Sequence, residues 1–180
     1  RACAPLNYHL LVAGRILQEL QQSKPFEYIQ EEAFVGIYRT ADVLMQDLVR
    51  VLRPHNLSLT QYNILRILRG AGSEGVNCKD IANRMVTRDP DVTRLLDRLE
   101  TRGLLSRGRT REDKRFVSIQ ITEVGLSTLE SLDAPIRQMQ LEVFRPMKEE
   151  QVHQLVDLLE ILRSREPRSD DAGTTEAGSQ

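Results

Sequence analysis

The chain has 180 residues, a formal net charge of −1, 40% hydrophobic residues and no Trp, so its core must consist mainly of Leu, Ile and Val. Its two cysteines, Cys3 and Cys78, are too few for a disulfide framework and fit no zinc-binding pattern, which makes a reducing cytosol the expected compartment. No apolar run in the sequence is long enough to span a membrane.

Residues 1–24 are either an extra amphipathic helix or sequence that is not native to the mature protein, and Pro25 ends this stretch. A long helix is then predicted over residues 27–53, because apolar residues recur there at steps of three and four. The residues of this stripe are Phe34, Ile37, Tyr38, Ala41, Leu44, Met45, Leu48 and Leu52. Pro54 ends the helix.

Polar residues that cap helix N-termini mark the next two helices. Ser58 or Thr60 can cap the next helix, and Ser58, with Gln61 three residues later, resembles a capping box. A loop with three glycines follows between residues 70 and 75. Asn77 is the predicted N-cap of a short helix over residues 78–85.

A third helix is predicted from Asp89, as its N-cap, to Arg102, with Pro90 in the first turn and Gly103 as the stop. Helical periodicity places its apolar side chains on one side: Val92, Leu95, Leu96 and Leu99. The opposite side carries Pro90, Arg94, Asp97 and Thr101, flanked by Asp91 and Thr93. This polar side is free to enter a major groove, although an ordinary amphipathic surface helix has the same pattern.

Two short strands are predicted next, over residues 104–109 and 115–121, with a turn between them. Thr122 caps a further helix, which Pro135 kinks or divides and Pro146 breaks, and a last helix extends to about Arg163. Residues 165–180 carry no apolar stripe, so we expect them to be disordered.

Two helices around a short turn, followed by a hairpin, are typical of a winged helix-turn-helix, a mostly α fold with a small β-wing. Residues 58–121 would form this domain. Eleven basic and seven acidic residues lie between Lys79 and Arg115, so positive charge is concentrated in this region. A basic hairpin tip suits a narrow minor groove, whereas a solvated charged turn is the alternative interpretation.

Three stretches resemble the MarR transcription regulators. Asp113-Lys114-Arg115, followed five residues later by Ile121-Thr122-Glu123-Val124-Gly125, resembles the wing signature of that family, with Ile121 where Leu is usual. Residues 92–100, with Gly103-Leu104 after them, are similar to its recognition helix, and residues 59–65 to the helix before the motif. The resemblance covers about residues 34–162 and implies a sequence-specific DNA-binding transcription regulator, a repressor released by a small-molecule ligand.

The resemblance also implies roles for individual residues. Arg115 would enter the minor groove, braced by a salt bridge from Asp113, while Arg111 and Lys114 would touch phosphates. The major-groove face would comprise Pro90, Asp91, Thr93 and Arg94. Family members are homodimers, which here would be joined by the helices over residues 27–53 and 122–164. A two-fold dimer implies a pseudo-palindromic operator with half-sites about one helical turn apart, in the cytoplasm of a bacterium.

Many members of the family respond to small aromatic or lipophilic effectors. Tyr38, His55 and Tyr62 are candidates for such a pocket, and the alternative interpretation of each is a packing or helix-end residue. One alternative is a DNA-binding protein without an effector, either architectural or regulated by a partner. Another is a thiol-based redox sensor at Cys78, which opens a helix but does not lie where redox-sensing relatives keep their cysteine.

The sequence offers no arrangement of residues that points to an enzyme. It has no Ser-His-Asp or Cys-His set with usable spacing, no glycine-rich phosphate loop and no cluster of metal ligands, and its three histidines are scattered. We therefore expect neither catalytic activity nor a metal or cofactor.

Overall fold

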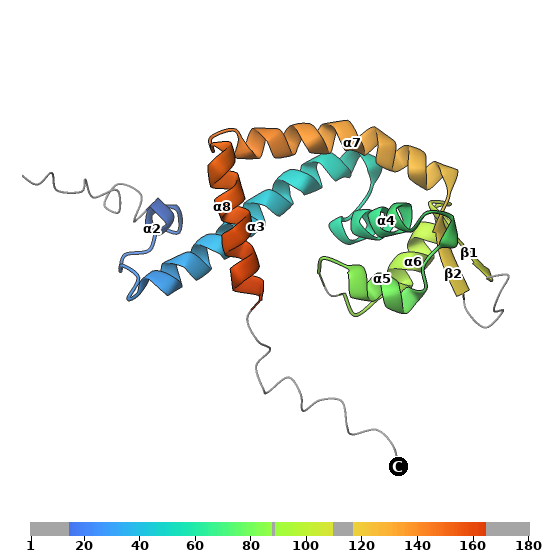
Figure 1. Ribbon diagram of the computed structural model, residues 1–180, viewed down its shortest axis with the longest axis horizontal. Helices are drawn as coiled ribbons and strands as arrows, with labels where there is room; N and C mark the ends of the chain where they lie inside the picture. The colour runs from blue at the N-terminus through green and yellow to red at the C-terminus, as the bar shows by residue number, and fades with distance from the viewer. Residues whose placement is uncertain (1–14, 88, 110–116, 165–180) are drawn as a thin grey trace, which may run out of the picture. The chain divides into compact units, whose positions relative to one another are not determined.

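The computed structural model describes residues 15–87, 89–109 and 117–164 (Figure 1). Over these ranges the chain is mostly helical with one two-stranded antiparallel sheet, which agrees with the predicted fold class. The chain divides into two compact units, Arg1–Met139 and Gln140–Gln180. No helix within the described ranges has the length and apolarity needed to cross a membrane. The predicted disordered tail, residues 165–180, lies outside them.

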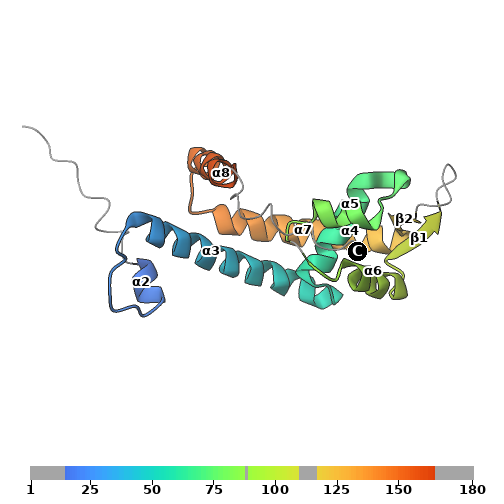
Figure 2. The same cartoon turned by 90° about the horizontal axis from the view of Figure 1, so that it is seen from below.

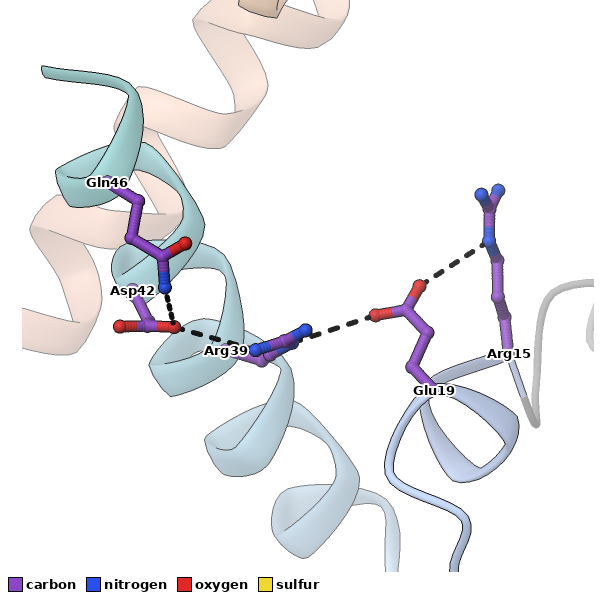
Figure 3. Close-up of polar contacts among 5 residues, drawn as sticks. All are labelled: Arg15, Glu19, Arg39, Asp42 and Gln46. Carbon is purple, nitrogen blue, oxygen red and sulfur yellow. Dashed lines mark hydrogen bonds and ion pairs between the residues drawn. The ribbon is translucent and has the colours of Figure 1, made fainter. Parts of the chain in front are cut away.

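A short helix, α2 (Arg15–Glu19), precedes the long helix α3 (Ile29–Leu52) and is connected to it by charge (Figure 3). The carboxylate of Glu19 lies 3.6 Å from Nε of Arg15 within α2 and 3.9 Å from Nε of Arg39 on α3. Exposed pairs of this kind contribute at most about 1 kcal/mol each. The helix α2 is therefore only weakly held against α3 by these contacts, and residues 1–14 lie outside the described part of the chain.

Much of the predicted apolar stripe on α3 is exposed to solvent. Leu52, at the end of the helix, is fully buried, whereas Phe34 and Tyr38 have exposed fractions of 72% and 76%. Isolated apolar residues on a surface are ordinary, but a row of them along one helix marks a surface that packs against something else.

The helix α4 (Leu59–Ala71) begins with the predicted capping box. The N–H of Gln61 donates to Oγ of Ser58, and the N–H of Ser58 donates to Oε1 of Gln61, both at 3.1 Å. The short 3-10 turn η1 (Arg53–His55) joins α3 to α4, and a second 3-10 turn, η2 (Gly72–Glu74), follows α4. The inner face of α4 contributes Ile64, Leu65 and Leu68 to the core.

The helix α5 (Cys78–Arg84) begins at its predicted N-cap, because Oδ1 of Asn77 accepts the N–H of Asp80 at 2.8 Å. It ends one residue earlier than expected, at Arg84, where Met85 takes an extended conformation.

The predicted start of the next helix is wrong. The helix α6 (Val92–Thr101) has Asp91, not Asp89, as its N-cap, and Pro90 lies in the preceding turn. The carboxylate of Asp89 instead accepts the N–H of Asp91 at 2.9 Å, which is the hydrogen bond of an Asx turn. Because this turn competes with the helix for the same backbone, α6 begins later than the capping rule predicts.

The wing strands β1 (Leu105–Arg109) and β2 (Val117–Ile121) pair antiparallel, from Leu105 opposite Ile121 to Arg109 opposite Val117. The strand β1 begins one residue later than predicted, and residues 115 and 116 lie outside the described ranges.

The simple alternation of buried and exposed residues that the sequence predicts for β2 is not observed. Val76 bridges the other edge of this strand, exchanging two backbone hydrogen bonds of 2.9 Å with Ile119. Ser118 is buried as well, because its hydroxyl donates to the carbonyl of Glu74 at 3.1 Å. The loop after α4 thus covers a strand face that would otherwise be exposed.

The helix α7 (Glu123–Phe144) begins at the predicted cap, where the N–H of Gly125 donates to Oγ1 of Thr122 at 3.1 Å. Pro135 lies inside α7 without dividing it, and the helix ends before Pro146. The second unit contains the end of α7 and the helix α8 (Glu149–Arg163), whose exposed apolar residues are Val156, Leu158, Ile161 and Leu162.

In the first unit, α4, α5, α6 and the hairpin lie together (Figures 1 and 2) around an aliphatic core. Its fully buried large side chains in the described ranges are Leu52, Ile64, Leu65, Leu68, Ile81, Leu96, Leu99, Leu105, Ile119, Leu129 and Leu132. This core, made of Leu and Ile as the composition predicts, fixes the helices and strands that carry the candidate interface.

Candidate nucleic-acid interface

The amphipathic character of α6 leaves one of its faces free. Its buried side chains are Val92, Leu96 and Leu99. Its exposed side chains include Thr93, Arg94, Asp97, Arg98 and Thr101. The apolar side packs against α4, α5 and β1, so the side that faces solvent is the polar side expected from the helical spacing.

Arg94 projects from the first turn of α6, and its side chain is 70% exposed. Its Nη1 lies 3.4 Å from Oδ2 of Asp91, three residues earlier. No side-chain capping bond is seen at Asp91 among the described residues, so its carboxylate pairs with Arg94 and does not cap the helix backbone. A guanidinium has five N–H donors, which leaves most of those of Arg94 available for other acceptors.

The other residues predicted for the major-groove face lie beside Arg94. Pro90 and Thr93 are both exposed, and Oγ1 of Thr93 lies 4.0 Å from Sγ of Cys78 at the start of α5. The structure therefore brings Pro90, Asp91, Thr93 and Arg94 together at the exposed N-terminal end of α6.

The turn between α5 and α6 is held in place by α4. Oδ1 of Asn63 accepts the N–H of Val86 at 2.9 Å, and Val86 has an exposed fraction of 84%. An apolar side chain this exposed beside α6 can contact a sugar or a thymine methyl group. Sequence reasoning missed both residues, because the position of Asn63 within a helix says nothing about a partner 23 residues away.

The wing residues predicted to touch DNA, namely Arg111, Asp113, Lys114 and Arg115, lie outside the described residues. The strands that lead to them are described as far as Arg109 and Val117, which pair with each other. Their roles in phosphate and minor-groove contacts therefore stay predictions.

One ionic cluster that sequence reasoning missed joins the hairpin to α6. Nη1 of Arg107, on β1, lies 2.7 Å from Oδ1 of Asp97 and donates to Oε2 of Glu100 at 3.0 Å. The two acids stand three residues apart on α6 and so share a face of the helix, which was a signal that a single cation nearby would contact both.

A cavity of about 560 Å³ lies between α5, α6 and the hairpin. Its lining residues are Asn77, Cys78, Lys79, Thr93, Leu96, Arg107, Val117 and Ile119. Thr93, one of the predicted major-groove residues, is among them, so this space opens beside α6.

The three residues predicted for an effector pocket are placed elsewhere. Tyr38 is exposed on α3, and Tyr62 is buried in α4, with the guanidinium of Arg66 5.8 Å from its ring centre. His55 is half-buried in η1, where its carbonyl accepts a bond of 2.9 Å from Arg102. None of the three lines the cavity beside α6.

The helix α4 is also connected to α7 by an ion pair. Nη1 of Arg69 donates to both carboxylate oxygens of Asp133, at 3.0 and 2.9 Å. This hydrogen bond raises the pKa of Arg69 above its ordinary value, so its guanidinium stays charged at every physiological pH.

Comparison with known proteins identifies the family to which the chain is similar. The MarR family model matches residues 57–117. The crystal structure of a MarR transcription factor from Planctomyces limnophilus is 35% identical, covers 76% of this chain and 98% of that one, and has a TM-score of 0.58. The HTH-type transcriptional repressor IacR of Pseudomonas putida is 26% identical, over 72% of this chain and 76% of its own.

A third similar protein shares the fold at lower identity. The structure of CouR from Rhodococcus jostii, solved with p-coumaroyl-CoA, is 24% identical, covers 79% of this chain and 99% of that one, and has a TM-score of 0.66. With a helix-turn-helix followed by a two-stranded wing, and a relative of 35% identity matched over almost its whole length, this chain belongs to the MarR family of transcription regulators.

Proposed function

We propose that this regulator recognises a specific DNA sequence through α6 and represses transcription from it. The observation that carries the proposal is the exposed N-terminal end of α6, where Arg94 stands beside Thr93 with its guanidinium oriented by Asp91. A major groove admits an α-helix, and an Arg that donates two bonds to O6 and N7 of guanine is the commonest specific contact in it. The repressor IacR, which is similar over most of its length, supports the direction of regulation.

The wing supplies the second contact with DNA in this proposal. Arg115 enters the minor groove, where a narrow groove concentrates negative potential, and Asp113 braces it. Arg111 and Lys114 bind backbone phosphates, which adds affinity without sequence information. The paired strands β1 and β2, which lead to these residues, support this assignment.

The active form is a homodimer that acts in the cytoplasm, where bacterial DNA is located. The exposed apolar row on α3, which includes Phe34 and Tyr38, supports an association surface on this helix. The exposed Leu158 and Ile161 support a second such surface on α8. A two-fold dimer reads a pseudo-palindromic operator, with half-sites about one helical turn apart.

A small aromatic or lipophilic ligand releases the protein from its operator. The CouR structure, which holds p-coumaroyl-CoA, supports a ligand of this class in a related fold. Among the residues predicted for the pocket, His55 has the strongest claim, since it lies at the junction of α3 and α4 and is half-buried. Tyr62 acts in packing within the core.

The proposal is tested by fluorescence anisotropy of the wild-type protein with duplex DNA from the region upstream of its own gene. A random duplex of equal length is the control, and both titrations are repeated across a salt series. We expect the protein to bind the upstream duplex at least roughly 1,000-fold more tightly than the random one, and its affinity to fall steeply as salt is added.

Two results would contradict the proposal. Equal, salt-sensitive binding to both duplexes, and to every duplex selected from a randomised pool, indicates a nonspecific DNA-binding protein. The absence of binding to any duplex removes the function altogether. If specific binding is found, adding aromatic acids and their thioesters tests the effector, and a complex that none of them dissociates favours a regulator without an effector of this class.

A further inference from the structure

Arg107 connects two elements that carry the candidate interface. It lies on β1, opposite Ile119 of β2, and its side chain crosses to α6. There a single guanidinium nitrogen contacts two carboxylates, those of Asp97 at 2.7 Å and Glu100 at 3.0 Å. The side chain of Arg107 is 27% exposed, whereas those of Asp97 and Glu100 are 55% and 39% exposed, so the contacts are only partly shielded from solvent.

The two carboxylates stand on the helix that is proposed to enter the major groove. Asp97 follows Thr93 by four residues and Arg94 by three, so it lies on the same side of α6 as they do. An uncompensated carboxylate at this position would repel the phosphates of bound DNA. The single positive charge of Arg107 offsets one of the two negative charges, and so weakens that repulsion without requiring Arg107 to touch DNA.

The surroundings of Arg107 show how this contact also affects geometry. The cavity beside α6 is lined by Thr93, Arg107 and Val117, so the side chains that the structure describes leave space between α6 and the hairpin on this side. Among the described residues, the ion pairs that join α6 to β1 are those of Arg107. Apolar packing already joins α6 to β1, and Arg107 adds an ionic contact between them on the side of the cavity.

We propose that Arg107 is a positioning residue for DNA recognition. It adds an ionic contact that helps to hold α6 against the hairpin, and it offsets part of the negative charge of Asp97 and Glu100 near the DNA. The proposal rests on the DNA-binding function proposed above. Direct contact between Arg107 and a phosphate is a competing explanation, which the following experiment separates from it.

The experiment is a double-mutant cycle on the full chain. Arg107→Gln is made in the wild type and in a background that carries Asp97→Asn and Glu100→Gln. Affinity is measured by anisotropy for the duplex that the wild type enriches from a randomised pool, and for a random duplex, across a salt series. Arg137→Gln, at an exposed position on α7, removes the same charge and is the matched control.

If Arg107 acts through the two carboxylates, Arg107→Gln weakens binding to the selected duplex about fivefold in the wild-type background. In the background without the carboxylates the same substitution changes affinity by less than about twofold, because there is no pair left to break. The preference for the selected duplex over the random one falls in parallel, and the control variant changes neither. Arg107→Lys keeps the positive charge but lacks the planar guanidinium, so it retains part of the affinity that Arg107→Gln loses.

Two outcomes overturn the proposal. An equal loss in both backgrounds, with the slope of log affinity against log salt reduced by about one unit, identifies a phosphate contact. Unchanged affinity in every variant shows that the bridge has no role in recognition. If Arg107→Gln fails to fold, Arg107→Lys carries the test. The selection with the wild-type protein is done before any variant is made. If the wild type enriches no duplex from the pool, the proposed DNA-binding function itself is wrong.

Discussion

The backbone of Gly125 lies directly against that of Leu104: a Cβ atom at Gly125 would stand 2.2 Å from the carbonyl oxygen of Leu104. The same carbonyl accepts the N–H of Thr122 at 3.2 Å, so the start of α7 is fastened to the residue just before β1. This close approach gives a physical reason for the glycine in Thr122-Glu123-Val124-Gly125. The wing and α7 can be joined this tightly only if position 125 has no side chain.

Gly125→Ala is therefore expected to lower the free energy of unfolding by about 1–3 kcal/mol, because the backbone must shift to admit one methyl group. Urea unfolding followed by circular dichroism measures the change. The matched control is Gly70→Ala in α4, where no described atom lies within 4 Å of the added Cβ. There we expect a gain of roughly 0.5–1 kcal/mol, since Ala is the better helix former. Equal stability of the two variants would contradict this interpretation of Gly125.

Arg94→Ala is expected to weaken binding to the preferred operator by about 1–3 kcal/mol and to relax the sequence preference at one position of each half-site. Competition between operator variants, each with a single base pair changed, measures both effects. Arg94→Lys is the matched variant, because it keeps the charge but cannot form the bidentate contact. If selectivity among the operator variants is unchanged by Arg94→Ala, Arg94 contacts only the backbone.

Arg115→Ala is expected to weaken operator binding by about 1–3 kcal/mol, since the wing would lose its minor-groove contact. The salt dependence of anisotropy titrations also tests this residue, because the slope falls as charged contacts with DNA are removed. Lys24→Ala, at an exposed position outside the predicted dimerisation helices and the DNA-binding domain, removes an equal charge and should leave affinity unaltered. Unchanged operator affinity in Arg115→Ala would disprove the assignment.

Phe34→Asp is expected to raise the dissociation constant of the dimer at least about tenfold, because an unpaired carboxylate would be buried in the association surface. Light scattering across a concentration series measures the change in mass. Val86→Asp, at an exposed apolar position outside the helices predicted to join the dimer, is the control and should leave the dimer intact. A protein that is monomeric before any substitution would refute the dimer proposal at once.

Features that depend on neighbours in the chain could be predicted from the sequence. The capping box of Ser58 and Gln61 formed as predicted, and so did the caps at Asn77 and Thr122, because each bond spans only three residues. Gly103, the predicted stop of α6, has a φ of 68°, which favours glycine. The apolar face of α6 followed from its periodicity.

Where two local preferences compete, the sequence was a poorer guide. Asp89, Pro90 and Asp91 each suit the start of a helix, and the rules of capping favoured the first of them. In the structure the Asx turn at Asp89 is formed outside α6, because its carboxylate reaches the N–H of Asp91 before the helix begins.

Sequence alone determined the fold class, the order of its elements and the polar face of α6, because periodicity and capping act over a few residues. Tertiary structure alone decided which polar groups meet across elements. The contact of Arg107 with Asp97 and Glu100, and that of Asn63 with Val86, depend on how separate elements pack around one core. The physical reason is that such contacts are set by packing in space, which local sequence patterns do not encode.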